Sequence, residues 1–273
     1  MLDPLSRRWF SQAGTVPAAA GRGPVVLMYH AIEPPGEPPR SRWSVTARAF
    51  GEQLHLLRDA GWTTLRVRDL IGRDSFPERS VVLTFDDGFD NNFDHGFKVL
   101  AELEMTATWF VVTGDIGGES SWIDPGQPVR TMLDREQLRV MAAAGMEIAA
   151  HSRGHASLPD LAPRQIAEEV QGSKDDLEAL LGETVVSFAY PFGRFNRHCL
   201  DAVAAAGFQV ACTTRPGWVG SEPDPLQVRR VAVFADDSLA TFARKLAFAD
   251  TDVGWKRMGR YALSRMRARL APA

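Results

Sequence analysis

The chain has 273 residues, of which 45% are apolar and 24% are charged, and its formal net charge at pH 7 is −3. These values are ordinary for a globular protein, whereas a dedicated nucleic-acid binder needs a basic face. No apolar run is long enough to span a bilayer. We therefore expect neither an integral membrane protein nor a nucleic-acid partner.

The first 23 residues are predicted to be an N-terminal surface extension. The adjacent Arg7 and Arg8 resemble a twin-arginine export signal, but no apolar segment follows them. A signal peptide requires that segment, so a cytoplasmic location is expected. The only cysteines, Cys199 and Cys212, belong to a predicted helix and the strand after it, so they indicate packing rather than a disulfide framework.

Short apolar runs alternate with segments of helical periodicity through most of the chain. This alternation predicts βα units around a parallel sheet. The predicted strands are 25–28, 81–85, 108–112, 147–150, 185–189, 208–212 and 231–234. The predicted helices are 50–60, 93–103, 134–144, 163–181 and 196–206. About seven such units predict one (β/α) barrel domain, which we assign to residues 24–240.

The C-terminal segment 241–273 is a predicted basic helical tail. It holds eight Lys or Arg residues against Asp250 and Asp252, so it carries a charge of +6. Within it, 253–273 has apolar residues at helical spacing, which favours either peripheral contact with an anionic inner membrane surface or a helix docked on the barrel. Membrane contact would suit a lipid-linked saccharide substrate in the cytoplasm.

Two motifs place metal-binding side chains directly after predicted strands. Asp86 and Asp87 follow the strand 81–85, and His151 and His155 follow the strand 147–150. Active sites of α/β barrels are built at such strand ends. A carboxylate with two imidazoles suits zinc or a similar divalent ion, while a second carboxylate can accept a proton from water. The sequence therefore predicts a mononuclear metal hydrolase.

These motifs resemble the first two signatures of the polysaccharide deacetylases, the NodB-homology or family 4 carbohydrate esterases. The matching residues are Thr84-Phe85-Asp86-Asp87-Gly88 and the run from His151 through His155 to Leu158. The resemblance implies a distorted (β/α)7-type barrel. It also implies that Asp86 is the general base and that Asp87, His151 and His155 hold the metal, most simply Zn²⁺.

A third motif differs from the usual family pattern. Ala189-Tyr190-Pro191-Phe192 has alanine where the family has arginine, and the resemblance implies that the Phe192 backbone N–H contributes to the oxyanion hole. The cation that orients the base must then come from elsewhere. Arg230, at the start of the last predicted strand, is the candidate, and a surface charge is its alternative interpretation. Tyr190 is a candidate substrate contact.

The connection 113–130 is long and rich in Gly and Pro, and we expect it to wall the site. Its Trp122 is a second candidate for contact with a sugar, with packing in the core as the alternative.

His30 is the candidate general acid. Many family members carry a C-terminal histidine for this role, but this chain has no histidine after His198. His30 ends the first predicted strand, so we expect it at the same face as Asp86, and imidazole titrates near neutral pH. The Met28-Tyr29-His30 signature resembles the subgroup that acts on exopolysaccharide poly-N-acetylglucosamine, which also tolerates a small residue in the third motif.

The expected function is metal-dependent removal of N-acetyl groups from amino sugars of a polysaccharide, exopolysaccharide or lipid-linked oligosaccharide, with release of acetate. Two alternatives stay open. One is a barrel amidohydrolase that acts on a small non-sugar amide, and the other is an inactive carbohydrate-binding protein.

Overall fold

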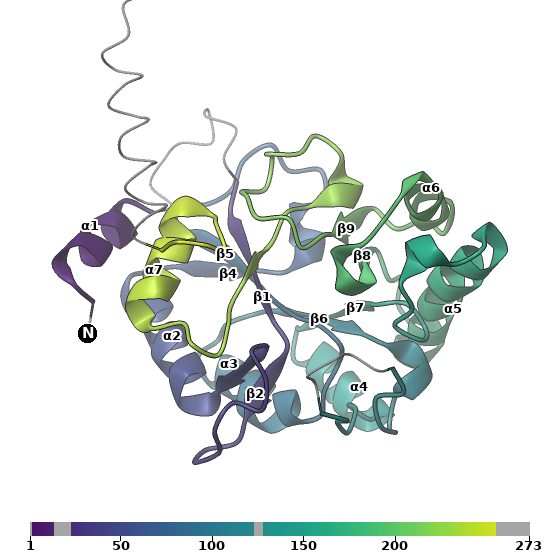
Figure 1. The fold of residues 1–273 in the computed structure, drawn as a ribbon, viewed down its shortest axis with the longest axis horizontal. Helices are drawn as coiled ribbons and strands as arrows, with labels where there is room; N and C mark the ends of the chain where they lie inside the picture. Colours follow the sequence, from purple (N-terminus) through teal and green to yellow (C-terminus); the bar gives the residue numbers. More distant parts are fainter. Residues whose placement is uncertain (1, 14–22, 123–127, 255–273) are drawn as a thin grey trace, which may run out of the picture.

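The computed structural model describes residues 2–13, 23–122 and 128–254. Within them, eight parallel strands form one curved sheet surrounded by helices (Figure 1). The strand order is β10-β1-β5-β6-β7-β8-β9, and β4 pairs with the first half of β5 on the edge that β6 uses further on. The strands are β1 (Val25–Tyr29), β4 (Thr63–Leu65), β5 (Ser80–Phe85), β6 (Thr108–Val111), β7 (Glu147–Ala150), β8 (Ser187–Ala189), β9 (Val210–Cys212) and β10 (Val231–Ala232).

The helices begin and end at the residues that their sequences favour. Asp134 caps α4 through its side chain, and Asn196 does the same for α6. Pro163 opens α5, which ends at Gly182 in the left-handed conformation. The helices are α1 (Pro4–Gln12), α2 (Ala47–Asp59), α3 (Lys98–Glu102), α4 (Arg135–Ala143), α5 (Pro163–Leu181), α6 (Arg197–Ala205) and α7 (Leu239–Phe248). A π-helical turn, Phe93–Phe97, precedes α3.

The segment around β10 joins the two edges of the sheet. Val228 donates its N–H to the Ala211 carbonyl in β9, and Val233 donates its N–H to the Met28 carbonyl in β1. The chain between these residues therefore lies between the first and last strands, and Arg230 enters the barrel from it. This architecture confirms the predicted (β/α)7-type barrel.

The predicted N-terminal surface extension is wrong for its first helix. In α1, Phe10 is buried and stacks on Trp62, and Trp9 packs edge-on against Phe248 of α7. Arg244 of α7 donates to the Ser6 hydroxyl. Figure 1 shows α1 and α7 side by side. These contacts make α1 part of the folded domain. They were not predicted because the partners lie far along the chain, where no local pattern indicates them.

The predicted boundary at 240/241 falls inside α7, whose Phe242 and Leu246 are buried in the core. The basic tail from 255 onward, and with it almost all of the 253–273 segment proposed to contact a membrane, lies outside the described residues. No helix among the described residues is long and apolar enough to cross a membrane.

A two-stranded sheet was not predicted. It consists of β2 (Ala31–Glu33) and β3 (Ser44–Thr46), which pair in parallel beside the barrel. Each strand has only three residues, too few to show a period of two. Buried Glu33 binds buried Arg130 through an ion pair, so this sheet is tied to the end of the 113–130 connection.

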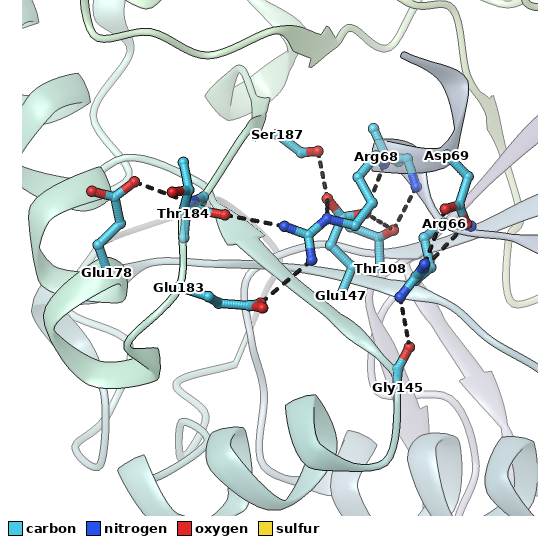
Figure 2. Close-up of polar contacts among 12 residues, drawn as sticks. Arg66, Arg68, Asp69, Thr108, Gly145, Glu147, Glu178, Glu183, Thr184 and Ser187 are labelled. Carbon is cyan, nitrogen blue, oxygen red and sulfur yellow. Dashed lines mark hydrogen bonds and ion pairs between the residues drawn. The ribbon is translucent and has the colours of Figure 1, made fainter. Parts of the chain in front are cut away.

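The amino end of the barrel is closed by a polar cluster around Glu147, the first residue of β7 (Figure 2). Its buried carboxylate accepts hydrogen bonds from the hydroxyls of Thr108 and Ser187 and from the backbone N–H of Arg68. The Arg68 guanidinium lies 3.9 Å away and also binds Glu183. Thr108 and Ser187 begin β6 and β8, so the cluster joins three strands at this end.

Candidate active site

Asp86 and Asp87 lie at the carboxyl end of β5, in a sharp backbone turn. The Asp86 N–H donates to the Tyr29 carbonyl of β1, which continues the sheet for one more residue. Asp87 then has a φ of 75° and Gly88 a φ of 88°. A Cβ on Gly88 would also lie 3.1 Å from a methyl of Val111, so glycine is required after the two carboxylates.

Asp87, His151 and His155 form a buried cluster in which one ligand atom from each lies within 4.8 Å of the others. The Nε2 atom of His151 lies 3.6 Å from Asp87 Oδ1, and that of His155 lies 3.4 Å from it. The His151 Nδ1 lies 2.8 Å from the Ala189 carbonyl, which can only accept a hydrogen bond. His151 therefore carries its hydrogen on Nδ1 and directs the Nε2 lone pair towards Asp87.

This cluster fits a divalent metal. Burial lowers the pKa of both imidazoles, which keeps them in the neutral form that binds metals. The hydrogen bond to Ala189 fixes the orientation of one ring, as is usual for metal-ligating histidines. One carboxylate and two imidazoles suit zinc, and three protein ligands leave a position open for water or substrate. The predicted ligands thus come together in one group that could hold a metal.

Asp86 and Arg230 form a fully desolvated ion pair beside this cluster. The guanidinium donates two hydrogen bonds to the carboxylate, with lengths of 2.6 and 2.7 Å. Arg230 is 0% exposed and Asp86 is 3% exposed. Arg230 also donates to the Thr213 carbonyl and the Thr84 hydroxyl. Arg230, from outside the third motif, therefore places a cation against Asp86.

The charge of Arg230 keeps Asp86 ionised. Burial acts to raise the pKa of Asp86, but the opposite charge of Arg230, with smaller contributions from nearby histidines, lowers the pKa to about 2. A carboxylate in this state accepts protons and does not donate them at neutral pH. The surface-charge interpretation of Arg230 is wrong, because its side chain is entirely inside the barrel.

His30 directly follows the carboxyl end of β1. The charges of Asp86 and His151 act on its imidazole. Burial lowers its pKa to about 4, so the imidazole is neutral at pH 7. The expectation that it titrates near neutrality is therefore wrong, because the ring is desolvated. Its Nδ1 is buried without a hydrogen-bond partner, and Trp43 covers the ring at a centroid distance of 4.7 Å.

Phe192 and Trp122 lie against His155 at the rim of the site. Their rings are 4.6 Å and 4.5 Å from the His155 ring, and Phe192 is 43% exposed. Trp122 also stacks on Phe89. The 113–130 connection therefore borders the site at Trp122.

Tyr190 is in a different environment. Its ring is 0% exposed and packs against Phe188 and Phe195, while its hydroxyl donates to the Leu226 carbonyl. This placement corrects the predicted substrate contact: the residue follows β8 directly and its side chain turns into the core.

Left-handed backbone conformations gather at this site. Of the seven described non-glycine residues with positive φ, four belong to it: Asp87, Ser152, His155 and Phe192. Each such residue costs about 1–3 kcal/mol and persists only where surrounding contacts hold it. The site is therefore strained locally and needs support from the residues around it.

Asn92 is a supporting residue that the sequence analysis missed. It is fully buried, donates to the His30 carbonyl at 2.7 Å and accepts the N–H of Ile32 at 3.1 Å. It therefore fixes the backbone that carries His30. Its position five residues after Asp87 was the available signal, but an asparagine in a loop is usually a turn residue.

A family model described as polysaccharide deacetylase matches residues 73–211. The matched segment contains both aspartates and both ligand histidines of the site. His30 lies before the matched segment and Arg230 after it.

The protein YxkH from Bacillus subtilis (strain 168) is 30% identical to the chain over 212 residues, which cover 76% of this chain and 70% of YxkH. The poly-beta-1,6-N-acetyl-D-glucosamine N-deacetylase of Staphylococcus epidermidis is 24% identical over 215 residues, covering 74% and 72%. Among solved structures, IcaB from Ammonifex degensii has a TM-score of 0.70 and 29% identity, and the similarity covers 83% of this chain and 97% of IcaB.

Proposed function

This chain belongs to the polysaccharide deacetylase family, and from that premise we propose that it is a metal-dependent hydrolase that removes N-acetyl groups from a poly-N-acetylglucosamine-type exopolysaccharide. The observation that carries the proposal is the buried Asp86–Arg230 pair next to the Asp87–His151–His155 cluster. This arrangement combines an ionised base with three metal ligands in one desolvated site.

Asp87, His151 and His155 would hold the metal, which is proposed to be Zn²⁺. When bound, such a cation supplies Lewis acidity to the acetamide carbonyl and to the attacking water. The protein's own contribution is to keep both imidazoles neutral and to fix the His151 ring through Ala189.

Asp86 is the proposed general base. It takes a proton from the water that attacks the acetamide carbonyl carbon, and Arg230 holds the carboxylate in place while it does so. Because both carboxylate oxygens already accept hydrogen bonds from Arg230, rotation of the carboxylate is restricted. The same pairing lowers the pKa of Asp86 and so makes it a weak base. Desolvation of the site and activation of the water by the metal would offset this weakness.

His30 is the proposed donor of the proton that the departing nitrogen receives. With a pKa of about 4 the ring is neutral before the reaction, so the proton that it donates must come from the attacking water. Asp86 takes that proton and passes it to His30, which then gives it to the departing nitrogen. The C–N bond then breaks to give acetate and a free amino sugar. The backbone N–H of Phe192 is the proposed oxyanion donor, a type of contact that contributes about 3–4 kcal/mol.

The substrate class rests on three supports. The Staphylococcus epidermidis relative is named for poly-beta-1,6-N-acetyl-D-glucosamine. An alanine in the third motif and an N-terminal acid histidine resemble the subgroup that acts on this polymer. Partly exposed Trp122 and Phe192 border the site, and aromatic faces of this kind suit the apolar face of a sugar ring.

Metal analysis combined with acetate release tests the proposal. We expect zinc in the purified protein and acetate release from β-1,6-linked N-acetylglucosamine oligomers that exceeds release from simple acetamides. Release from small non-sugar amides alone would favour the amidohydrolase alternative. Release from a lipid-linked saccharide in preference to free oligomers would redirect the substrate assignment to the membrane surface. Absence of bound metal together with absence of turnover would leave only a carbohydrate-binding role.

A further inference from the structure

The loop between the two ligand histidines is held from outside by helix α5. This loop, Ser152–Gly154, connects His151 to His155. The backbone is strained at both of its ends, because Ser152 and His155 have φ values of 63° and 52°. Two α5 carboxylates, Glu169 and Asp176, reach the loop, and both are half-buried.

Glu169 caps the loop backbone. One of its carboxylate oxygens accepts the N–H of Arg153 at 3.0 Å and the N–H of Gly154 at 2.8 Å. Two adjacent N–H groups that converge on one oxygen form an anion-binding turn. This contact holds the backbone immediately before His155, whose own N–H donates to the Ser152 hydroxyl at 3.0 Å.

Asp176 holds the same loop through its side chain. Its carboxylate accepts hydrogen bonds from the Arg153 guanidinium at 2.9 and 3.3 Å and from the Thr113 hydroxyl at 2.8 Å. The Arg153 carbonyl accepts the N–H of Gly114 at 2.8 Å. The loop is thus bound on one side to α5 and on the other to the segment after β6.

Two glycines make this arrangement possible. A Cβ on Gly172, in the middle of α5, would lie 2.3 Å from Cδ of Arg153, and a Cβ on Gly114 would lie 2.6 Å from the Arg153 carbonyl oxygen. A glycine inside a helix is unfavourable, so its presence in α5 needs a packing reason. The passage of the Arg153 side chain across the helix at this point is that reason.

We propose that Glu169 is a positioning residue for the metal site: by binding the backbone N–H groups of Arg153 and Gly154, it sets the loop that presents His155 to the metal. The inference rests on the proposed function, since it requires that Asp87, His151 and His155 bind a metal. Glu169 acts only through the loop and not on the substrate.

Zinc affinity of the full-length protein tests this role. The dissociation constant for Zn²⁺ is measured by chelator competition in the wild type, Glu169→Ala, Glu169→Gln and Glu168→Ala. Supporting residues of metal ligands are typically worth about 10- to 100-fold in affinity, and we expect a loss of that size for Glu169→Ala. The amide oxygen of Glu169→Gln can still accept both N–H groups, so this variant should recover most of the affinity.

Glu168→Ala is the matched control. Glu168 is the neighbouring residue on α5, is 59% exposed and pairs only with Arg164 in the contacts that the structure records. It should bind zinc as the wild type does. The absorption spectrum of the Co²⁺-loaded protein is the second readout, because a displaced imidazole changes the ligand field, and only Glu169→Ala is expected to alter it.

Wild-type affinity and spectrum in Glu169→Ala would overturn the positioning role, and so would an equal loss in Glu168→Ala or no recovery in Glu169→Gln. A wild-type protein that binds no zinc or other divalent metal would instead overturn the proposed function, and the inference with it. Circular dichroism of the metal-free variants separates these results from misfolding. If Glu169→Ala does not fold, Glu169→Asp takes its place: its carboxylate is one methylene shorter and cannot reach both N–H groups, so a lower zinc affinity than in Glu168→Ala supports the positioning role and an equal affinity overturns it.

Discussion

Asp86 and Glu147 are buried carboxylates at opposite ends of the barrel, and they are stabilised in different ways. At the carboxyl end, Asp86 is 3% exposed and binds Arg230 through two hydrogen bonds. At the amino end, Glu147 is 2% exposed and is bound mainly by two hydroxyls and one backbone N–H, with the Arg68 guanidinium 3.9 Å away (Figure 2).

This difference reverses the direction of the pKa shift. Burial tends to raise both pKa values, but the charge of Arg230 outweighs it for Asp86, whose pKa falls to about 2. For Glu147 burial outweighs the hydrogen bonds, and the pKa is raised. Burial alone therefore does not decide whether a carboxylate is a base. A full opposite charge at hydrogen-bond distance keeps Asp86 ionised, whereas hydroxyl donors favour Glu147 as a structural group.

Replacement of Asp86, the carboxylate at the carboxyl end of the barrel, should have the largest effect on turnover. Asp86→Asn keeps the shape but removes the proton acceptor, and we expect kcat to fall by about 10³- to 10⁴-fold, the upper part of the range for general base catalysis. The bound metal should be retained, because Asp87 and the histidines are unchanged. Acetate release and metal content are measured on the same sample. Wild-type turnover in this variant would remove Asp86 from the mechanism.

Removal of the partner charge should have the next largest effect, on stability. Arg230→Ala leaves the Asp86 carboxylate buried without a counter-charge, and breaking a buried pair in this way typically costs about 3–5 kcal/mol. The free energy of unfolding is measured by urea denaturation. Arg230→Lys keeps the charge but not the two parallel hydrogen bonds and should lie between wild type and alanine. A loss below about 1 kcal/mol would show that the pair behaves as an exposed one.

A smaller loss of turnover is expected for His30→Ala. A proton donor contributes about 10²-fold at the lower end of its usual range, and we expect kcat to fall by that factor. Metal content should not change, because His30 is not among the cluster residues. His198→Ala, at an exposed position of α6, is the control and should keep wild-type turnover. Loss of metal in His30→Ala would instead make His30 a ligand.

The parts of the fold that could be predicted are those with a local signal. The helix α5 was predicted at its observed bounds because Pro163 and Gly182 mark its ends, and β7 was predicted as the short run that leads into His151. By contrast, α1 is held by Phe10 against Trp62, a contact across more than fifty residues that no local pattern contains. The strand β2 was missed because three residues are too few to show a period of two.

The site shows the same limit. The ligand cluster could be predicted because Asp87, His151 and His155 each follow a strand. Arg230 could be identified only because Ala189 left a cation missing, and the two bonds to Asp86 depend on the way β10 closes the barrel. The depressed pKa of His30 could not be predicted, since it arises from burial of the ring in the folded chain, where Trp43 covers it.

Glu147→Gln should have the smallest effect and is the sharpest test of the comparison. The amide keeps an acceptor for one hydroxyl and removes the buried charge, so the free energy of unfolding near neutral pH should change by no more than about 1 kcal/mol. Because the folded-state pKa is raised, the wild type loses stability relative to the variant as pH rises from the ordinary glutamate value through the raised one. The variant's relative stability should therefore increase from pH 4 to pH 8.

Urea denaturation across this pH range measures the difference, with Glu183→Gln as control. Glu183 also binds Arg68 but is 48% exposed, so its replacement tests whether Arg68 alone carries the effect. A variant that loses several kcal/mol, as expected for a broken buried ion pair, would mean that Arg68 neutralises Glu147 as fully as Arg230 neutralises Asp86. Asp86 and Glu147 would then both be neutralised by an arginine. What would distinguish Asp86 as the proposed base would be its position beside the Asp87–His151–His155 cluster and not its pairing with Arg230.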